Sequence, residues 1–141
     1  RPHLTETQLK KLIRMREEST DAVMNRYLDF FLFQTFTGMA YSDAKSFDYD
    51  QHVVSIDGKD YIDGHRIKTG NEFVTPILPI TRKILERNNY KMEITSNQKY
   101  NQFLKGIGLA LSCSFPLTTH VARHYLSPYS LKMSNLYESL Y

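Results

Sequence analysis

Three side chains that suit phosphate chemistry lie close together near the C-terminal end of the sequence: His120, Arg123 and His124. Residues three and four positions apart share a helix face, so a helix here would place these groups on one side. A guanidinium presents a planar fork that matches two phosphate oxygens, and an imidazole can donate a hydrogen bond or move a proton near neutral pH. The pattern indicates a phosphate site. A buried structural arginine and a capped core histidine are the alternative interpretations.

The spacing of His120 and His124 also fits two ligands of a helical zinc site. The metalloprotease helix motif, however, requires Glu directly after the first His, and this chain has Val121 at that position. The sequence therefore predicts no metal site here.

A second candidate group is Lys68, which lies among predicted strands. Residues 52–56, 60–63 and 72–77 are rich in β-branched and aromatic residues and are separated by turn sequences such as Asp57–Gly58. This arrangement places Lys68 at the tip of the hairpin between the second and third strands. An ammonium on such a loop can enter a DNA groove or protonate a leaving oxygen. An ordinary turn lysine is the alternative.

Helices are predicted on both sides of the strands, and capping residues mark where they begin. The helix that ends at Thr37–Gly38 is apolar on nearly every face and should lie in the middle of the core. The predicted helices cover residues 5–16, 20–36, 42–47, 79–88, 96–111 and 118–126. The sequence thus predicts an α+β, mainly helical fold, with helices around a small three-stranded antiparallel sheet, in a single domain over residues 1–141.

Charge is distributed unevenly along the chain, whose formal net charge is +3. Residues 1–80 have a net charge of −2, whereas residues 81–141 have a net charge of +5. Clustered Lys and Arg give affinity for polyanions through counterion release, so the basic part favours a nucleic-acid partner. The alternative is that these Lys and Arg residues only form a solvated surface, which is equally consistent with the net charges.

The cellular setting follows from the cysteine count and the hydropathy. Cys113 is the single cysteine, so no intrachain disulfide is possible and a reducing, cytoplasmic location is expected. No apolar stretch approaches the ~20 residues that span a bilayer, and no signal peptide is recognisable. The opening Arg1–Pro2–His3 suggests a fragment of a longer protein.

Four motifs, taken in order, resemble a known arrangement: Thr37-Gly38-Met39-Ala40-Tyr41-Ser42-Asp43, Lys68-Thr69-Gly70, Ser96-Asn97-Gln98-Lys99-Tyr100-Asn101 and Thr118-Thr119-His120-Val121-Ala122-Arg123-His124. The sequence is similar in these segments to the catalytic domain of tyrosine recombinases of the phage-integrase family, especially integrases of Bacteroides mobile elements. The similarity covers about residues 4–124.

The resemblance implies a reaction as well as a fold. In that family a tyrosine attacks a DNA phosphate, leaving a 3′-phosphotyrosyl link and a free 5′-hydroxyl, without a metal or a small-molecule cofactor. By position, Arg123 and His120 would stabilise the transition state and Lys68 would protonate the leaving oxygen. Asp43 and His124 would support them. Double-stranded DNA is the implied partner, and the expected DNA contacts are Lys68, Arg66, Lys99 and Lys105.

The chain departs from the family pattern at two places. Most members have an arginine where this chain has Ala40, and Arg66 is a candidate replacement. The tail over residues 125–141 diverges, lacks the family's Gly-His box and contains Pro128, so the C-terminal part of the catalytic fold is expected to be incomplete. Its candidate nucleophiles are Tyr125, Tyr129, Tyr137 and Tyr141, among which Tyr137 is preferred.

Three functions are consistent with the sequence. The first is site-specific DNA recombination or integration by a catalytic domain that is incomplete or inactive in this chain. The second is a DNA-binding or assembly module without catalysis, which self-associates on DNA and packs its tail on a partner subunit. The third, suggested by the aromatic content, is a protein-interaction domain unrelated to DNA.

Overall fold

The structure is a computed structural model that describes residues 3–66, 74–94, 96–123 and 129–141. For His65, His120, Arg123, Tyr129 and Ser130 it describes the backbone alone. The chain order of its elements is α1 (Glu6–Glu18), α2 (Ala22–Thr37), α3 (Tyr41–Lys45), α4 (Tyr49–His52), β1 (Val53–Ile56), β2 (Lys59–Asp63), the 3₁₀ helix η1 (Gly64–Arg66), β3 (Val74–Pro76), α5 (Pro79–Arg87), α6 (Asn97–Ala110), α7 (Thr119–Arg123) and α8 (Tyr129–Leu140). The predicted fold class is confirmed: the described chain is mainly helical, with a small antiparallel sheet.

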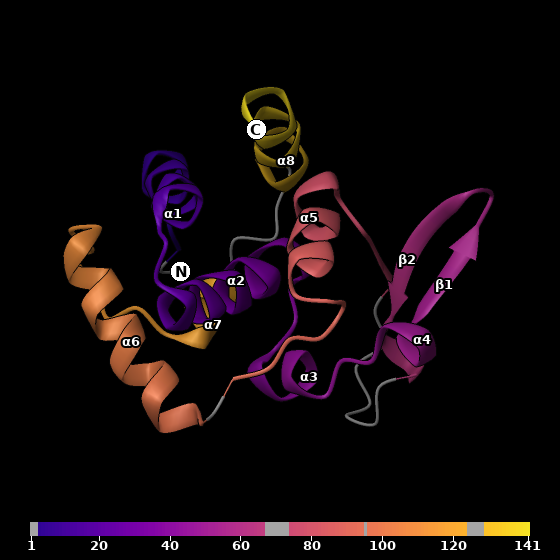
Figure 1. The fold of residues 1–141 in the computed structure, drawn as a ribbon, viewed down its shortest axis with the longest axis horizontal. Coiled ribbons are helices and arrows are strands. Elements are labelled where there is room, and N and C mark those ends of the chain that lie inside the picture. The colour runs from indigo at the N-terminus through magenta and orange to yellow at the C-terminus, as the bar shows by residue number, and fades with distance from the viewer. Residues whose placement is uncertain (1–2, 67–73, 95, 124–128) are drawn as a thin grey trace.

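The three strands form a sheet in the order β1-β2-β3. Asp57 and Gly58 have φ angles of 51° and 78°, which suit a tight hairpin turn between β1 and β2. Ile62 in the central strand is fully buried and pairs with Val53 on one side and Thr75 on the other. The sheet therefore attaches to the core through the centre of β2, while the β1–β2 hairpin extends away from the helices (Figure 1).

The prediction that the first strand begins at residue 52 is wrong. His52 ends α4, where it is buried and its Nδ1 accepts a hydrogen bond of 2.9 Å from the backbone N–H of Asp48. The Asp48 carboxylate in turn accepts hydrogen bonds from the N–H groups of Asp50 and Gln51. This local cap stabilises a helical turn ahead of the strand. The predicted third strand also extends one residue too far, since β3 ends at Pro76, and its residues 72 and 73 lie outside the described residues.

Most predicted helix ends are confirmed because capping side chains define them. Thr5 and Gln8 form a reciprocal capping box, and Asp21 and Ser96 cap α2 and α6. Gly38 ends α2 with a φ of 74°, a left-handed conformation that favours glycine.

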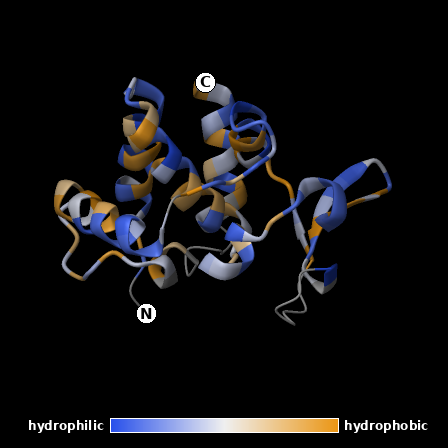
Figure 2. Ribbon diagram, turned by 60° about the horizontal axis from the view of Figure 1, so that its bottom comes forward, coloured by the Kyte–Doolittle hydropathy of each residue, from blue (hydrophilic) through white to orange (hydrophobic). Residues whose placement is uncertain are grey.

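Helix α2 lies at the centre of the fold, as its uniformly apolar pattern predicts. Its residues from Tyr27 to Thr37 are all buried, and α1, α3, α5 and α7 pack against it. The surrounding helices turn their apolar sides inward and their polar sides outward (Figure 2). Among the described residues, no helix has the length and apolar character needed to cross a bilayer.

The tail contains a helix, α8, that the sequence did not lead us to predict. Met133 and Tyr137 lie four positions apart and bury one face of α8 against the core, where it contacts α5 and α1. Ser134 on the same helix is fully buried, and its Oγ accepts a hydrogen bond of 3.0 Å from the N–H of Ile80. Leu78, the N-cap of α5, supplies no side-chain hydrogen bond, so α8 provides the missing acceptor.

A buried carboxylate connects the helices of the core. Asp29 on α2 is 1% exposed and accepts hydrogen bonds from Arg16 Nε at 2.8 Å, from Arg87 Nε at 3.0 Å and from Asn88 Nδ2 at 2.9 Å. Burial alone would lower the pKa of Arg87, but the charge of Asp29 and the hydrogen bonds from Arg87 to Asp29 and Glu17 raise it above its ordinary value. We call these ion-paired residues (Arg16, Glu17, Asp29 and Arg87) the Asp29 network.

Replacing Asp29 tests this network. Asp29→Asn keeps the shape but removes the carboxylate that pairs with both Arg16 and Arg87 and leaves Arg87 with Glu17 alone, so we expect a loss of about 3 kcal/mol in the free energy of unfolding. Urea denaturation followed by circular dichroism measures the loss. Glu138→Gln, on the exposed side of α8, is the control and should change the same quantity by less than ~0.5 kcal/mol. Equal stability of both variants would refute the role of Asp29.

Candidate nucleic-acid interface

The predicted phosphate-binding segment forms a short helix on the central helix of the fold. Val121 and Ala122 are buried, and α7 packs against α2. The structure describes only the backbone of His120 and Arg123, while Lys68 and His124 lie outside the described residues. The convergence of Arg123, His120 and Lys68 on one phosphate therefore stays a prediction.

The loop between α2 and α3 is held by buried hydrogen bonds. Gln34 Nε2 donates to the carbonyl oxygen of Met39 at 3.2 Å, and Gln34 Oε1 accepts a hydrogen bond of 2.6 Å from Tyr100 Oη on α6. The hydroxyl of Thr37 donates to Phe33 O at 2.7 Å and accepts from Met39 N at 3.3 Å. This loop carries Ala40 and is thus tied to α6. The hydrogen bond between the buried side chains of Gln34 and Tyr100 could not be predicted from a single sequence.

Asp43, expected to support the site, is 1% exposed within α3. Its backbone carbonyl accepts a hydrogen bond from Ser46 Oγ at 3.2 Å. Ala40, where an arginine was expected, is the N-cap of α3 and makes no side-chain capping bond. The supporting role of Asp43 stays a prediction.

The expected DNA contacts fall in two regions. Arg66, on η1 beside the sheet, pairs with Asp63 at 3.5 Å and donates to the Gln51 carbonyl at 3.4 Å. Lys99 and Lys105 are exposed on α6. Helix α6 and the sheet lie at opposite ends of the long axis of the molecule (Figure 1), so the structure does not bring Arg66 together with these lysines.

Helix α6 has a polar, solvent-facing side that extends beyond the two lysines. A groove of about 390 Å³ is lined by amide side chains and one lysine: Asn97, Gln98, Asn101, Gln102 and Lys105. The helix has no Asp or Glu. Leu109, further along this helix, is 83% exposed. The sequence predicted the two lysines as DNA contacts but not the amides, although the amides are spaced three and four residues apart, as on one helix face.

Helix α1 fixes the C-terminal end of α6. Lys11 Nζ donates to the carbonyl of Ala110 at 2.9 Å, and Gln8 Nε2 donates to that of Leu111 at 3.3 Å. These bonds satisfy carbonyls that the end of a helix leaves without partners. Together with Tyr100 near its N-terminal end, they hold α6 along its length.

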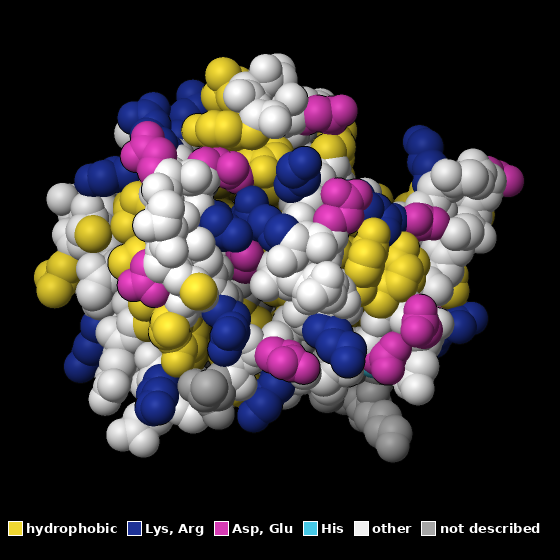
Figure 3. All heavy atoms as spheres, viewed as in Figure 1, with side chains coloured by type: hydrophobic (Ala, Val, Ile, Leu, Met, Phe, Trp, Pro, Cys, Tyr) yellow, Lys and Arg dark blue, Asp and Glu magenta, His cyan; other side chains and the backbone are white. Residues whose placement is uncertain are grey.

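Charged side chains of both signs are spread over the face seen in Figure 3. Lys and Arg side chains lie at the upper left, in the centre and along the lower margin, with Asp and Glu side chains among them. A polyanion that approaches this face therefore meets charges of both signs.

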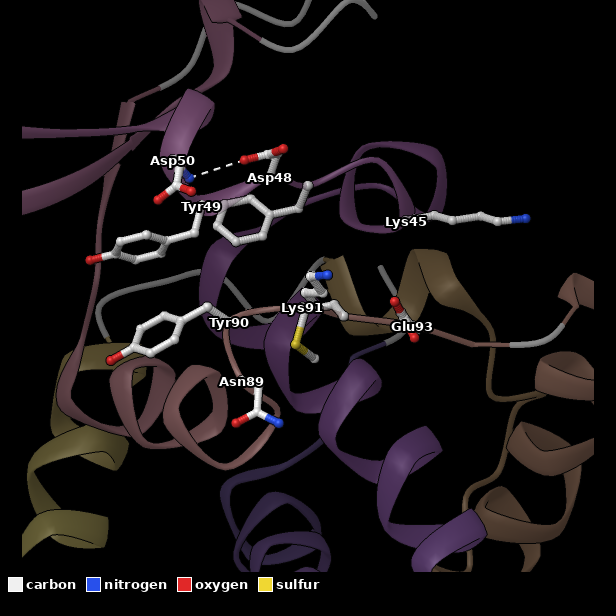
Figure 4. Close-up of a pocket in the computed structure, with 10 residues that line it drawn as sticks. Lys45, Asp48, Tyr49, Asp50, Asn89, Tyr90, Lys91 and Glu93 are labelled. Atoms are coloured by element: carbon white, nitrogen blue, oxygen red, sulfur yellow. Dashed lines mark hydrogen bonds between the residues drawn. The ribbon is translucent and has the colours of Figure 1, made fainter.

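A larger cleft of about 680 Å³ lies between the α3–α4 segment and the chain after α5. In Figure 4 the rings of Tyr49 and Tyr90 lie side by side, with Asp48 and Asp50 close to Tyr49. The two rings meet edge to face at 4.8 Å. Its lining combines the carboxylates of Asp48, Asp50 and Glu93 with the ammonium groups of Lys45 and Lys91, so a phosphate inside the cleft would meet charges of both signs.

Comparison with known proteins supports the fold. No protein-family model matches the sequence, and no curated protein matches it. Among solved structures, the chain is similar to the XerH site-specific recombinase bound to its difH substrate in a pre-cleavage complex, with a TM-score of 0.59 and 15% sequence identity. The match covers 99% of this chain and 43% of that chain.

The chain has the fold of a recombinase catalytic domain. It spans less than half the length of the recombinase that it matches. At 15% identity the similarity establishes the arrangement of the helices and the sheet rather than the identity of site residues. Within the described parts of the recombinase-like fold, no group of His, Cys, Asp and Glu could hold a metal ion.

Tyr137, the preferred candidate nucleophile, is buried on α8 of the recombinase-like fold. Its hydroxyl donates a hydrogen bond of 2.7 Å to Glu17 Oε1, next to Arg87. Burial and the hydrogen bond to Glu17 raise the pKa of Tyr137 to about 12, although the charge of Arg87 opposes the shift. A nucleophilic hydroxyl is activated by a base or a lowered pKa, so this environment holds the phenol in its neutral form.

The raised pKa predicts a pH dependence of stability. The folded chain holds the Tyr137 proton to about pH 12, whereas the unfolded chain releases it near the ordinary pKa of 10. The contribution of Tyr137 is thus fully present below pH 10 and is lost as the pH rises towards 12. Wild type should lose more stability over this range than Tyr137→Phe, as measured by urea denaturation. Parallel losses in the two proteins would contradict the buried hydrogen bond.

Proposed function

We propose that the chain is a DNA-binding recombinase catalytic domain that acts in site-specific recombination or integration. The observation that carries the proposal is the exposed face of α6, with four amides and Lys105 along one groove and no carboxylate on the helix. Asn and Gln can form paired hydrogen bonds with adenine in the major groove, and Lys contacts guanine or phosphate.

The dimensions of α6 suit this role. Its 14 residues extend for about 21 Å, and B-DNA's major groove admits a helix. Gly106 has open space beside its backbone, which allows close approach to a partner. The similar recombinase was solved with its DNA substrate, and the recombinase fold supports the same class of partner for this chain.

The reaction that the resemblance implies is cleavage and rejoining of DNA through a phosphotyrosyl link. Arg123, His120 and Lys68 would act on the phosphate, without a metal or a small-molecule cofactor, and Asp43 and His124 would support them. With Ala40 in place of an arginine, and Tyr137 held by Glu17, the catalytic domain is proposed to be incomplete or inactive in DNA strand cleavage and rejoining. We propose that the chain belongs to an integrase of a mobile element. Such an integrase would work in the cytoplasm and self-associate on DNA.

A DNA-binding or assembly module without catalysis is the second candidate. The specific observation in its favour is α8, which packs on α1 and α5 and buries Tyr137. The two candidates share the DNA-binding face and differ in whether a covalent product forms.

Salt-dependent binding to DNA tests the DNA-binding function that the two candidates share. Fluorescence anisotropy with a mixed-sequence duplex should show affinity that falls steeply as salt rises. The double variant Lys99→Ala/Lys105→Ala should flatten the slope of log affinity against log salt by about 2, since each lysine lost from a phosphate contributes roughly 1. Lys83→Ala, an exposed lysine on α5, is the matched control. Binding that does not depend on salt would refute a DNA function.

A nicked suicide substrate separates the two candidates. A covalent adduct should be undetectable by denaturing gel electrophoresis if the domain is inactive. An adduct mapped by peptide mass spectrometry to a tyrosine of the tail would show that it is catalytic, and Arg123→Ala should then abolish the adduct.

A further inference from the structure

Lys45, the last residue of α3, carries an exposed ammonium group that the function described so far does not use. Its Nζ lies 5.8 Å from the centroid of the Tyr41 ring. Residues four apart share a helix face, and the electron-rich ring attracts the cation. The side chain is therefore drawn back over the ring of Tyr41, the first residue of α3.

The ring below this ammonium is fixed in place. Tyr41 stacks on Tyr100 of α6, with centroids 6.0 Å apart and an interplanar angle of 24°, and it contacts Phe30 of α2 at 5.8 Å. Tyr100 is itself bound to Gln34. The position of Lys45 is thus coupled to α6, the helix that carries the proposed DNA contacts.

Lys45 differs in its pairing from the arginines near the sheet and in the core. Arg66 pairs with Asp63, and Arg82 pairs with Asp60. Over the ranges that the structure describes, no carboxylate forms an ion pair with Lys45, which extends away from Asp48 and Asp50 in Figure 4. A cation that is not neutralised by a carboxylate of its own chain can attract an external anion.

We propose, building on the DNA-binding function above, that Lys45 contacts a DNA phosphate beside the start of α3. It takes the place of the arginine expected at position 40, where the methyl group of Ala40 cannot reach a phosphate. Lys45 fits this place better than Arg66, whose guanidinium is engaged by Asp63 and the Gln51 carbonyl on the sheet side of the molecule.

Charge variants of Lys45 test this contact with the same mixed-sequence duplex. Lys45→Ala and Lys45→Gln should weaken binding about three- to tenfold at low salt and flatten the slope of log affinity against log salt by about 1. Lys45→Arg should retain the wild-type affinity and the wild-type salt slope. The control Lys83→Ala should match wild type. Thermal unfolding checks that every variant is folded, which is expected because Lys45 is exposed.

A further variant tests the place of the contact. Ala40→Arg added to Lys45→Ala should restore the affinity and the salt slope, because it returns a cation to the start of α3. Failure of Ala40→Arg to restore them would overturn this assignment.

The outcomes separate this inference from the function on which it rests. Salt-dependent binding by wild type, together with an unchanged affinity and slope in Lys45→Ala, would overturn the role of Lys45 alone. Absence of salt-dependent binding in wild type would overturn both proposals. A charge effect at Lys45 that Lys83→Ala does not share supports the contact.

Discussion

The arrangement of the helices depends on the charge of Asp29, buried in the middle of the most apolar helix of the chain. A lone carboxylate in that position would be strongly unfavourable, and it is stabilised by donors from α1 and from the C-terminal end of α5. Glu17 extends the same network to α8 through Tyr137. Hydrogen bonds to a charge are directional, so they favour one relative position of these helices. Dispersion forces alone would restrict the positions of the helices less.

This constraint links the core to the surface proposed to bind DNA. Helix α2 contributes Asp29 near its middle and Gln34 near its end, and Gln34 connects the loop before α3 with α6. Tyr41 extends the connection to Lys45 through ring contacts. The groups proposed to contact DNA therefore lie on elements whose positions are set by buried polar bonds of the central helix.

Much of the fold could be predicted because its signals are local. Thr5, Asp21, Gly38 and Ser96 define helix ends through bonds within three or four residues, and runs of β-branched and aromatic residues between turn sequences indicate the strands. Helix α8 was missed because its stability comes from distant partners, namely the Ile80 N–H and the Glu17 carboxylate. His52 was misassigned because an Asp48 cap competes with a β-branched run. For the site, the sequence predicted Lys99 and Lys105 as DNA contacts, which stays a prediction, whereas the positions of Gln34, Tyr41 and Lys45 depend on which helices meet in space.

The bonds that α1 makes to the end of α6 have a consequence for binding energetics. Lys11 and Gln8 hold the last carbonyls of α6, and Tyr100 holds its first turns. A helix secured in this way has already lost its backbone freedom when the chain folds, so a partner that docks on it needs to order only side chains. Gln and Lys side chains on this face still lose about 1.5–2 kcal/mol of rotamer entropy each when they are ordered, so the saving concerns the backbone. The amide face of α6 is thus preorganised, and a larger share of the contact energy remains available as affinity.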